Sequence, residues 1–391
     1  MQYILFDGPE REALLPFTFT RPVAHIRCGI DRLIDKWEYA LKEKCSIQAH
    51  QDLLGKYATD YGALNVFINP AFLPTQELVE AILALSEGEL LHYEEKTVAS
   101  VTKENYPLEL RSAKKIITIN DPLIHLDDKT AIFLKNDEVL RNDFTRITKG
   151  KKSQSIHSSN HVKCPENIFI EEGAVVEGAS LNASTGPIYI GKNVEVMEGS
   201  LLRGSIALCA HAVVKMGAKI YGGTTIGPWS KVGGELSNVV IFGYSNKGHD
   251  GFLGNAVIGE WCNIGAATDA SNLKNSYAKI RVWDYQKTTF AKTELQFCGL
   301  LMGDYSRCGI HTMFNTATVI GVCANIYGAG FPRTFLPSFS FGGAQGLKTN
   351  DFDKAMEANS AMMERRGKQL SDEDIAVLKQ IFTFSAQWRR D

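Results

Sequence analysis

The chain has 391 residues, of which 44% are hydrophobic, and its formal net charge is −2 at pH 7. This length predicts two or three domains, and the hydrophobic fraction is that of a folded globular protein. The small net charge argues against nucleic acid or an anionic membrane surface as a partner. No apolar run reaches the ~18 residues of a membrane span, and the opening MQYILFDG does not resemble a signal peptide. We therefore expect a cytoplasmic protein.

Residues 1–150 alternate between short apolar runs and helical patterns. Strands are predicted over 3–6, 65–69, 90–101 and 115–119, and helices over 29–42 and from Thr75 onward. This alternation predicts an α/β domain with a mainly parallel sheet. The polar and basic stretch 149–160 is the predicted boundary of this first domain.

A six-residue repeat dominates the middle of the chain. Its apolar members are Ile190, Val196, Leu202, Leu208, Val214, Ile220, Ile226 and Val232. A period of six fits neither an α-helix nor a hairpin sheet, but it fits a three-faced prism wound as a parallel β-helix. Eighteen residues then form one coil, and the coils stack at about the usual inter-strand spacing of ~4.8 Å.

The repeat slips out of phase at several places, where we expect loops to leave the prism. The slip between Asn238 and Gly254 is the one expected to carry a site, because insertions in solenoids gather on the binding face. Residues 272–297 form a second interruption, either a loop excursion or irregular coils. We expect the β-helix domain to span 151–335, and a helical extension, with helices over 352–366 and 372–389, to span 336–391.

The first slip contains one histidine, His249, within YSNKGHDGFLG (244–254). Imidazole titrates near neutral pH and is a common general base. An isolated loop histidine is more often an ordinary surface residue, so the residues that follow have to decide between the two interpretations.

Those residues resemble the bifunctional N-acetylglucosamine-1-phosphate uridylyltransferase/glucosamine-1-phosphate N-acetyltransferase family. The family's acetyltransferase half has a histidine, a Leu-Gly, an Ile-Gly, an Asn-Ile-Gly-Ala run and a later asparagine. Their ungapped counterparts here are His249, Leu253-Gly254, Ile258-Gly259, Asn263-Ile264-Gly265-Ala266 and Asn272. The resemblance implies a left-handed β-helix of hexapeptide repeats over 151–335.

The resemblance also implies roles for these residues. His249 would take the proton from the 2-amino group of glucosamine 1-phosphate as it attacks acetyl-CoA. Asn263 and Asn272 would hold the sugar or order the reacting groups, and backbone amides near Ala266 would stabilise the charge that develops on the thioester oxygen. The CoA arm would lie along the solenoid between subunits, and we expect a homotrimer.

Several departures concern the sugar phosphate. Phe252 replaces a family tyrosine, Ser237 replaces a lysine, and Lys219 replaces an arginine. Lys247, Lys274 and Lys279 would supply the positive charges missing around the sugar phosphate. Asn246, beside Lys247, would add an amide. The substrate-binding set predicted from the sequence is therefore Lys219, Asn246, Lys247, Asn263, Asn272, Lys274 and Lys279.

The N-terminal half lacks the glycine-rich phosphate loop of sugar nucleotidyltransferases, since only Gly8 follows the first strand. Over nearly its full length, however, the chain resembles a divergent branch of the family found in Bacteroidetes-type bacteria, with Thr20-Arg21-Pro22 and SNKGHDGFLG. The residues expected to bind nucleotide are Arg11, Arg21 and Arg27. The acidic residues considered for Mg²⁺ are Asp7 and Asp121, then Asp137 and Asp143.

We therefore expect a two-domain transferase of UDP-N-acetylglucosamine biosynthesis. The β-helix would acetylate glucosamine 1-phosphate, or a related amino sugar, and the α/β domain would join the product to UTP with Mg²⁺. Two alternatives remain: a nucleotidyltransferase whose β-helix only oligomerises, and a non-catalytic regulator that binds sugar nucleotides.

Overall fold

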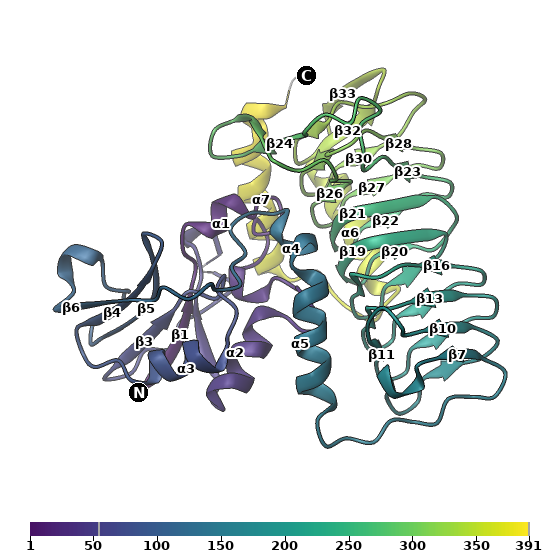
Figure 1. Cartoon of the computed structure of the whole chain (residues 1–391). Helices are drawn as coiled ribbons and strands as arrows, with labels where there is room; N and C mark the ends of the chain where they lie inside the picture. The colour runs from purple at the N-terminus through teal and green to yellow at the C-terminus, as the bar shows by residue number, and fades with distance from the viewer. Residues whose placement is uncertain (54, 390–391) are drawn as a thin grey trace. The chain divides into compact units, whose positions relative to one another are not determined.

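The computed structural model describes residues 1–53 and 55–389 (Figure 1). Internal contacts divide the chain into two compact units, one of residues 1–26 and 31–129 and the other of residues 27–30 and 130–391. Within the described residues, no helix combines the length and the apolar character needed to cross a membrane.

The first unit is an α/β domain built on a six-stranded sheet of order β2-β1-β3-β5-β4-β6. Its strands are β1 (Gln2–Phe6), β2 (Cys45–Gln48), β3 (Asn65–Ile68), β4 (Glu89–Tyr93), β5 (Lys96–Thr102) and β6 (Lys115–Thr118). Strands β2, β1 and β3 are parallel, as are β4 and β6, whereas β5 runs antiparallel to β3 and β4. The mainly parallel sheet predicted from the sequence is confirmed.

Helices α1 (Glu10–Ala13), α2 (Leu33–Leu41) and α3 (Gln76–Leu83) complete this unit. Helix α2 buries Ile34 and Trp37 against the sheet, as its helical spacing predicts. Thr75 caps α3 by accepting a hydrogen bond from the Leu78 backbone N–H at 3.1 Å.

Besides residues 27–30, the second unit contains α4 (Ala131–Leu134) and α5 (Asn136–Thr148) and continues into a parallel β-helix with three faces. Face A consists of β8 (Ile168–Ile170), β11 (Ile188–Ile190), β14 (Ile206–Leu208), β17 (Thr224–Ile226), the second halves of β19 (Glu235–Gly243) and β21 (Phe252–Glu260), β26 (Leu301–Met302), β29 (Val319–Ile320) and β31 (Phe335–Leu336).

Face B consists of β9 (Val175–Val176), β12 (Glu195–Val196), β15 (Val213–Val214), β18 (Lys231–Val232), β20 (Asn246–Lys247), β22 (Asn263–Ile264), β27 (Arg307–Cys308), β30 (Asn325–Ile326) and β32 (Ser340–Gly343). Face C consists of β7 (His161–Lys163), β10 (Ser180–Asn182), β13 (Leu201–Arg203), β16 (Lys219–Ile220), the first halves of β19 and β21, β23 (Asp269–Ala270) and β28 (Met313–Phe314).

The predicted hexad residues fill the interior of this prism. All eight, from Ile190 to Val232, are buried in one hydrophobic cluster and rotate through faces A, B and C in turn. Residues of successive coils pair in register, for example Val196 with Val214 and Val214 with Val232. The six-residue period therefore sets both the fold and the stacking.

The first phase slip is different from what we expected, because no loop leaves the prism there. Leu236 follows Val232 by four residues instead of six, so one corner is shortened, and β19, β20 and β21 remain in the ladder. The second interruption is a true excursion: β24 (Arg281–Asp284) and β25 (Thr289–Lys292) form an antiparallel hairpin, closed at its base by a bridge between Leu273 and Phe297.

The corner between faces A and B is built from residues in the left-handed backbone region. They are Asn193, His211, Trp229, Tyr244, Trp261, Tyr305, Cys323 and Phe339, with φ between 53° and 61°. Rings of neighbouring coils stack there, His211 on Trp229 and Tyr244 on Trp261, with centroids 4.0 and 4.3 Å apart. Each coil therefore relies on its neighbours to hold a strained corner.

The chain ends in a hairpin and two helices. Strand β33 (Gly346–Thr349) pairs with β32, and α6 (Phe352–Glu364) and α7 (Asp372–Phe384) follow. Helix α6 lies on face B, where Arg307 donates to the Asn359 side chain at 2.6 Å. Ser371 caps α7 by accepting from the Asp374 N–H at 3.1 Å.

Candidate functional sites

His249 is exposed on the corner that joins face B to face C, two residues after β20. No residue in the described part of the chain hydrogen-bonds its imidazole ring. Because strands on either side are locked into the ladder, His249 is presented on a rigid edge and its ring is open to solvent.

The shortened corner of the preceding coil lies directly against this turn. A Cβ atom on Gly234 would come within 2.7 Å of the Gly251 carbonyl oxygen and 2.9 Å of the His249 carbonyl oxygen. Gly234 also has a φ of +73°, which favours glycine. The corner of the previous coil is thus reduced to bare backbone, and the His249 turn rests on it.

Lys247 lies inside the prism. It occupies the inward column of face B, in register with Val232 of the previous coil, and its side chain is 2% exposed. Its Nζ donates to the His249 carbonyl oxygen at 2.5 Å. Burial lowers the pKa of Lys247 to about 8, although Asp250 and Asp269 partly oppose this shift. This placement differs from the substrate-facing lysine expected from the sequence, because the register slip moves Lys247 onto an inward position.

Ala266 occupies the same corner in the next coil. The two coils are in register, since Asn246 pairs with Asn263 and the Ala267 N–H donates to the Asp250 carbonyl at 3.0 Å. No described residue accepts a hydrogen bond from the Ala266 N–H. A free backbone donor therefore lies one coil away from His249, where the resemblance expected an amide to stabilise charge.

Asn246 and Asn263 are neighbours on the outer surface of face B. Arg366, just after α6, donates to Asn246 Oδ1 at 3.2 Å. Lys231 pairs with Asn246 from the previous coil. Burial, then the nearby charges of Arg366 and Lys215, lower the pKa of Lys231. We call Lys215, Lys231, Arg365 and Arg366 the face B basic cluster.

Three other predicted residues lie elsewhere. Asn272 donates to Asn255 Oδ1 at 2.8 Å, and Asn255 Nδ2 donates in turn to Asn238 Oδ1 at 3.0 Å when the Asn238 amide is oriented to satisfy both its ends. This asparagine ladder gives Asn272 a structural role. Lys279 forms an ion pair with Glu294 within the excursion, and Lys274 Nζ lies 3.5 Å from the Lys279 carbonyl.

Lys219 lies on the outer surface of face C. It pairs with Glu235, which pairs with Phe252 of the coil that carries His249. Lys219 is therefore on the face adjoining the His249 corner, two coils away along the prism axis.

In the first unit, polar side chains collect where β1, β2 and β3 end. Asp7 accepts hydrogen bonds from the Val23 and His50 N–H groups at 2.7 and 2.9 Å, and burial raises its pKa. Glu10 accepts a hydrogen bond from the Asn69 side chain and contacts His125 Nε2, both at 2.9 Å. Burial alone would raise the pKa of Glu10, but these two contacts outweigh it and the pKa is lowered. The carboxyl edge of a parallel sheet is the usual ligand site of such folds.

The predicted nucleotide-binding arginines differ in their surroundings. Arg11 and Arg21 are buried in the first unit, and Arg11 is paired with Glu12 and with Asp52 at 3.1 Å. Arg27 belongs to the second unit, where it donates to the Phe242 carbonyl at 3.1 Å and to the Ile30 carbonyl. Arg27 is therefore engaged with backbone of the β-helix unit.

The acidic candidates for Mg²⁺ are scattered. Asp121 is exposed beyond β6, whereas Asp137 and Asp143 lie on α5, paired with Arg141 and Arg146. Within residues 1–53 and 55–389, no three His, Cys, Asp or Glu side chains gather into a possible metal site. Both Asp7 oxygens already serve backbone N–H groups, so these residues do not fit a preformed magnesium site.

Sequence reasoning missed Gly234, Lys231 and Arg366. The four-residue step from Val232 to Leu236 was visible in the sequence and marks the shortened corner. Placing Arg366 beside Asn246 requires the fold, because 120 residues separate them.

Known proteins resemble parts of the chain. The UDP-N-acetylglucosamine acyltransferase of Arabidopsis is 16% identical, with 60% of this chain and 99% of that chain covered and a TM-score of 0.23. AntD, an N-acyltransferase from Bacillus cereus, whose structure contains dTDP and 3-hydroxybutyryl-CoA, is 14% identical over 53% of this chain and 91% of that chain, also with a TM-score of 0.23. Residues 3–152 match the family model described as sugar nucleotidyl transferase, which assigns this segment to a transferase family.

Proposed function

We propose that the chain is a bifunctional transferase that acts on an amino-sugar phosphate, glucosamine 1-phosphate being the first candidate. The β-helix transfers an acetyl group from acetyl-CoA to the amino group, and the N-terminal unit joins the product to UTP. The family match of residues 3–152 supports the second activity. The surroundings of His249 support the first, and its exposed ring on a rigid corner is the observation that carries the proposal.

Chemically, His249 acts as the general base. An amine must lose a proton as it attacks a thioester, and an exposed imidazole on a fixed backbone can accept it. The free N–H of Ala266, one coil away, is available to the carbonyl oxygen as negative charge develops there. Departure of the CoA thiolate then completes the transfer.

The face B basic cluster is suited to a phosphate group. Lys231 and Arg366 lie beside Asn246, three residues before His249. Guanidinium and ammonium groups both bind phosphate strongly, and the guanidinium can do so with two parallel hydrogen bonds. These residues take over the role that the sequence assigned to Lys247, Lys274 and Lys279.

A row without side chains runs beside the His249 corner. The outward positions that follow the inward column of face B are Lys215, Gly233, Gly248, Gly265, Gly309 and Tyr327 in successive coils. At Gly248 an added Cβ would meet nothing within 4 Å. Four glycines at an inter-strand spacing of ~4.8 Å form a row of roughly 15 Å without side chains. Gly233 is buried, whereas Gly248, Gly265 and Gly309 are partly exposed and offer an extended acyl-CoA arm a place to lie.

Asp7 and Asp121 do not gather with other acidic or histidine side chains into a Mg²⁺ site within the described residues. The residues proposed for UTP are those at the carboxyl edge of the first sheet, together with the buried cations Arg11, next to Glu10, and Arg21.

The test is incubation with glucosamine 1-phosphate, acetyl-CoA, UTP and Mg²⁺, omitting each component in turn. His249→Ala should lose acetyl transfer and keep uridylyl transfer from N-acetylglucosamine 1-phosphate. Uridylyl transfer without any acetylation by the unmodified protein would favour a β-helix that only oligomerises. If neither product forms, the bifunctional proposal fails.

A further inference from the structure

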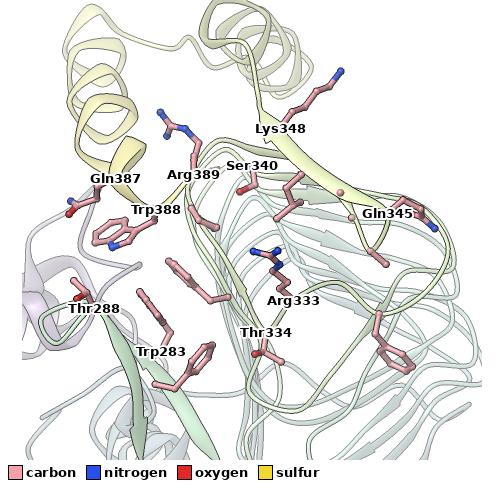
Figure 2. Close-up of a pocket in the computed structure, with 18 residues that line it drawn as sticks. Trp283, Thr288, Arg333, Thr334, Ser340, Gln345, Lys348, Gln387, Trp388 and Arg389 are labelled. Atoms are coloured by element: carbon pink, nitrogen blue, oxygen red, sulfur yellow. The ribbon is translucent and has the colours of Figure 1, made fainter. Parts of the chain in front are cut away.

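A pocket of about 980 Å³ lies at the far end of the second unit, away from the coil of His249. Four segments line it: the hairpin β24–β25, the stretch 331–337 with β31, the hairpin β32–β33, and the turn 387–389 after α7. Figure 2 shows Arg333 and Thr334 inside the cavity, between Trp283 and Trp388 to one side and Gln345 to the other. Its volume is at the upper end of small-ligand pockets, which span roughly 300–1,000 Å³.

One wall of the pocket is aromatic. Trp283 stacks on Phe335 with ring centroids 3.9 Å apart, and Trp388 meets Phe335 edge to face at 6.2 Å. Phe331, also in the lining, is 53% exposed. Phe331 therefore adds to the lining an exposed aromatic ring, a surface on which a planar ring can bind.

The remaining lining is positively charged. It contains Arg333, Lys348 and Arg389 but no aspartate or glutamate. Lys348 Nζ lies over the Phe341 ring, 5.2 Å from its centroid, and Figure 2 shows this side chain directed away from Arg333. Arg389 is fixed by hydrogen bonds to the carbonyls of Ser338 and Phe382, at 3.1 and 2.7 Å. Arg333 has no hydrogen bond or ion pair to any described residue. Because the whole chain has a net charge of −2, this excess of cations is local and calls for an anionic ligand.

We propose that this pocket binds a nucleotide, with its base against the aromatic wall and its phosphates on Arg333. A planar ring covalently joined to two or more negative charges is the chemistry that matches both walls at once. Neither wall alone would select it, since a simple anion does not use the rings and a neutral aromatic ligand leaves Arg333 unpaired.

Two sources supply this chemistry: a free nucleotide, or the nucleotide end of acyl-CoA. The site does not depend on the role proposed for His249, because no lining residue lies in the coils next to that corner. Its test therefore uses binding alone.

The experiment is photolabelling of the full chain with 8-azido-ADP, with the modified peptides identified by mass spectrometry. Label is expected within 283–290 or 331–348. Arg333→Ala should raise the concentration needed for half-maximal labelling roughly tenfold, equivalent to the loss of one charge-assisted contact. The matched control is Arg281→Ala, an exposed arginine of the same hairpin outside the lining, which should change it less than twofold.

A second variant tests the aromatic wall. Phe331→Ala removes an exposed ring and leaves the core intact, and it should weaken labelling while near-ultraviolet circular dichroism remains unchanged. Competition then identifies the source: stronger protection by CoA than by ADP or UDP assigns the pocket to acyl-CoA, and the reverse order assigns it to a free nucleotide. The proposal would be overturned if these peptides carried no label, or if Arg333→Ala labelled at the same half-maximal concentration as the unmodified protein. Protection by pyrophosphate equal to that by ADP would also overturn it.

Discussion

Replacing Lys247 by methionine should make the protein more stable and less active. In the column of face B, Lys247 stands where neighbouring coils place Val232 and Ile264. A pKa of about 8 in place of 10.5 means that holding the charged amine inside the prism costs about 3 kcal/mol. Methionine removes this cost and loses one hydrogen bond, worth about 1 kcal/mol. The variant should gain about 2 kcal/mol at pH 7.

The gain should depend on pH in a defined way. Between the folded pKa of about 8 and the unfolded value of 10.5, the unfolded chain binds more protons at Lys247 than the folded chain does. The stability of the unmodified protein relative to the variant therefore rises with pH through this window. Above pH 10.5 the penalty is gone and the variant should be the less stable of the two. Burial raises the pKa of the nearby Cys308 thiol.

Urea unfolding followed by far-ultraviolet circular dichroism at pH 7 and pH 10 measures this difference. Ile264→Met, one coil further in the same column, is the matched control, and its effect should stay under about 1.5 kcal/mol at both values. A Lys247→Met variant that is less stable at pH 7, or whose stability difference does not change with pH, would refute the reasoning.

Acetyl transfer by the Lys247→Met variant should be slower, although the variant is more stable. Lys247 Nζ is the only side-chain donor that the described residues direct to the His249 carbonyl, so its loss frees the turn. We expect the rate of acetyl transfer to fall at least tenfold while the KM for acetyl-CoA changes little, because the lysine does not face the ligand.

The remaining predictions concern the corner, the ladder and the assembly. Gly234→Ala should abolish acetyl transfer. Gly217→Ala is the control, because Gly217 has a similar φ of +68° but nothing within 4 Å of the added Cβ, and it should lower stability only. Equal acetyl-transfer kinetics of the two variants would contradict the role of the shortened corner. Asn272→Ala should lower stability by about 1 kcal/mol, through the lost hydrogen bond to Asn255, and leave the KM for the sugar unchanged; a large KM increase would return Asn272 to the substrate site. Light scattering should give three times the chain mass of 43.2 kDa, and a monomer would remove any acyl-CoA groove between subunits.

The sequence predicted the β-helix well because its signal is local and repeated. Inward residues such as Ile190 and Val214 recur at fixed spacing, and spacing is all that such a coil requires. The site was less predictable, because a slip of two residues has two structural solutions. A loop can leave the prism, or a corner can be cut short, and only the second places Lys247 inside.

Residues that act through distant partners were beyond sequence reasoning. Asn272 has the spacing of a sugar ligand, but its amide is used by a ladder that forms only when coils stack. Arg366 was predicted to lie at the end of a packing helix, and the fold brings it to Asn246. In both cases the deciding contact joins residues of different coils or elements.

Because each strained corner is held by the neighbouring coils, the position of the His249 coil along the β-helix affects how easily it opens. Of the nine strands on face A, β19, whose coil leads to His249, is the fifth, with four before it and four after it. In a one-dimensional stack the ends have one neighbour and open first, and protection increases toward the centre. The proposed catalytic corner is thus in the part of the array that fraying reaches last, so partial melting from either end would leave it assembled.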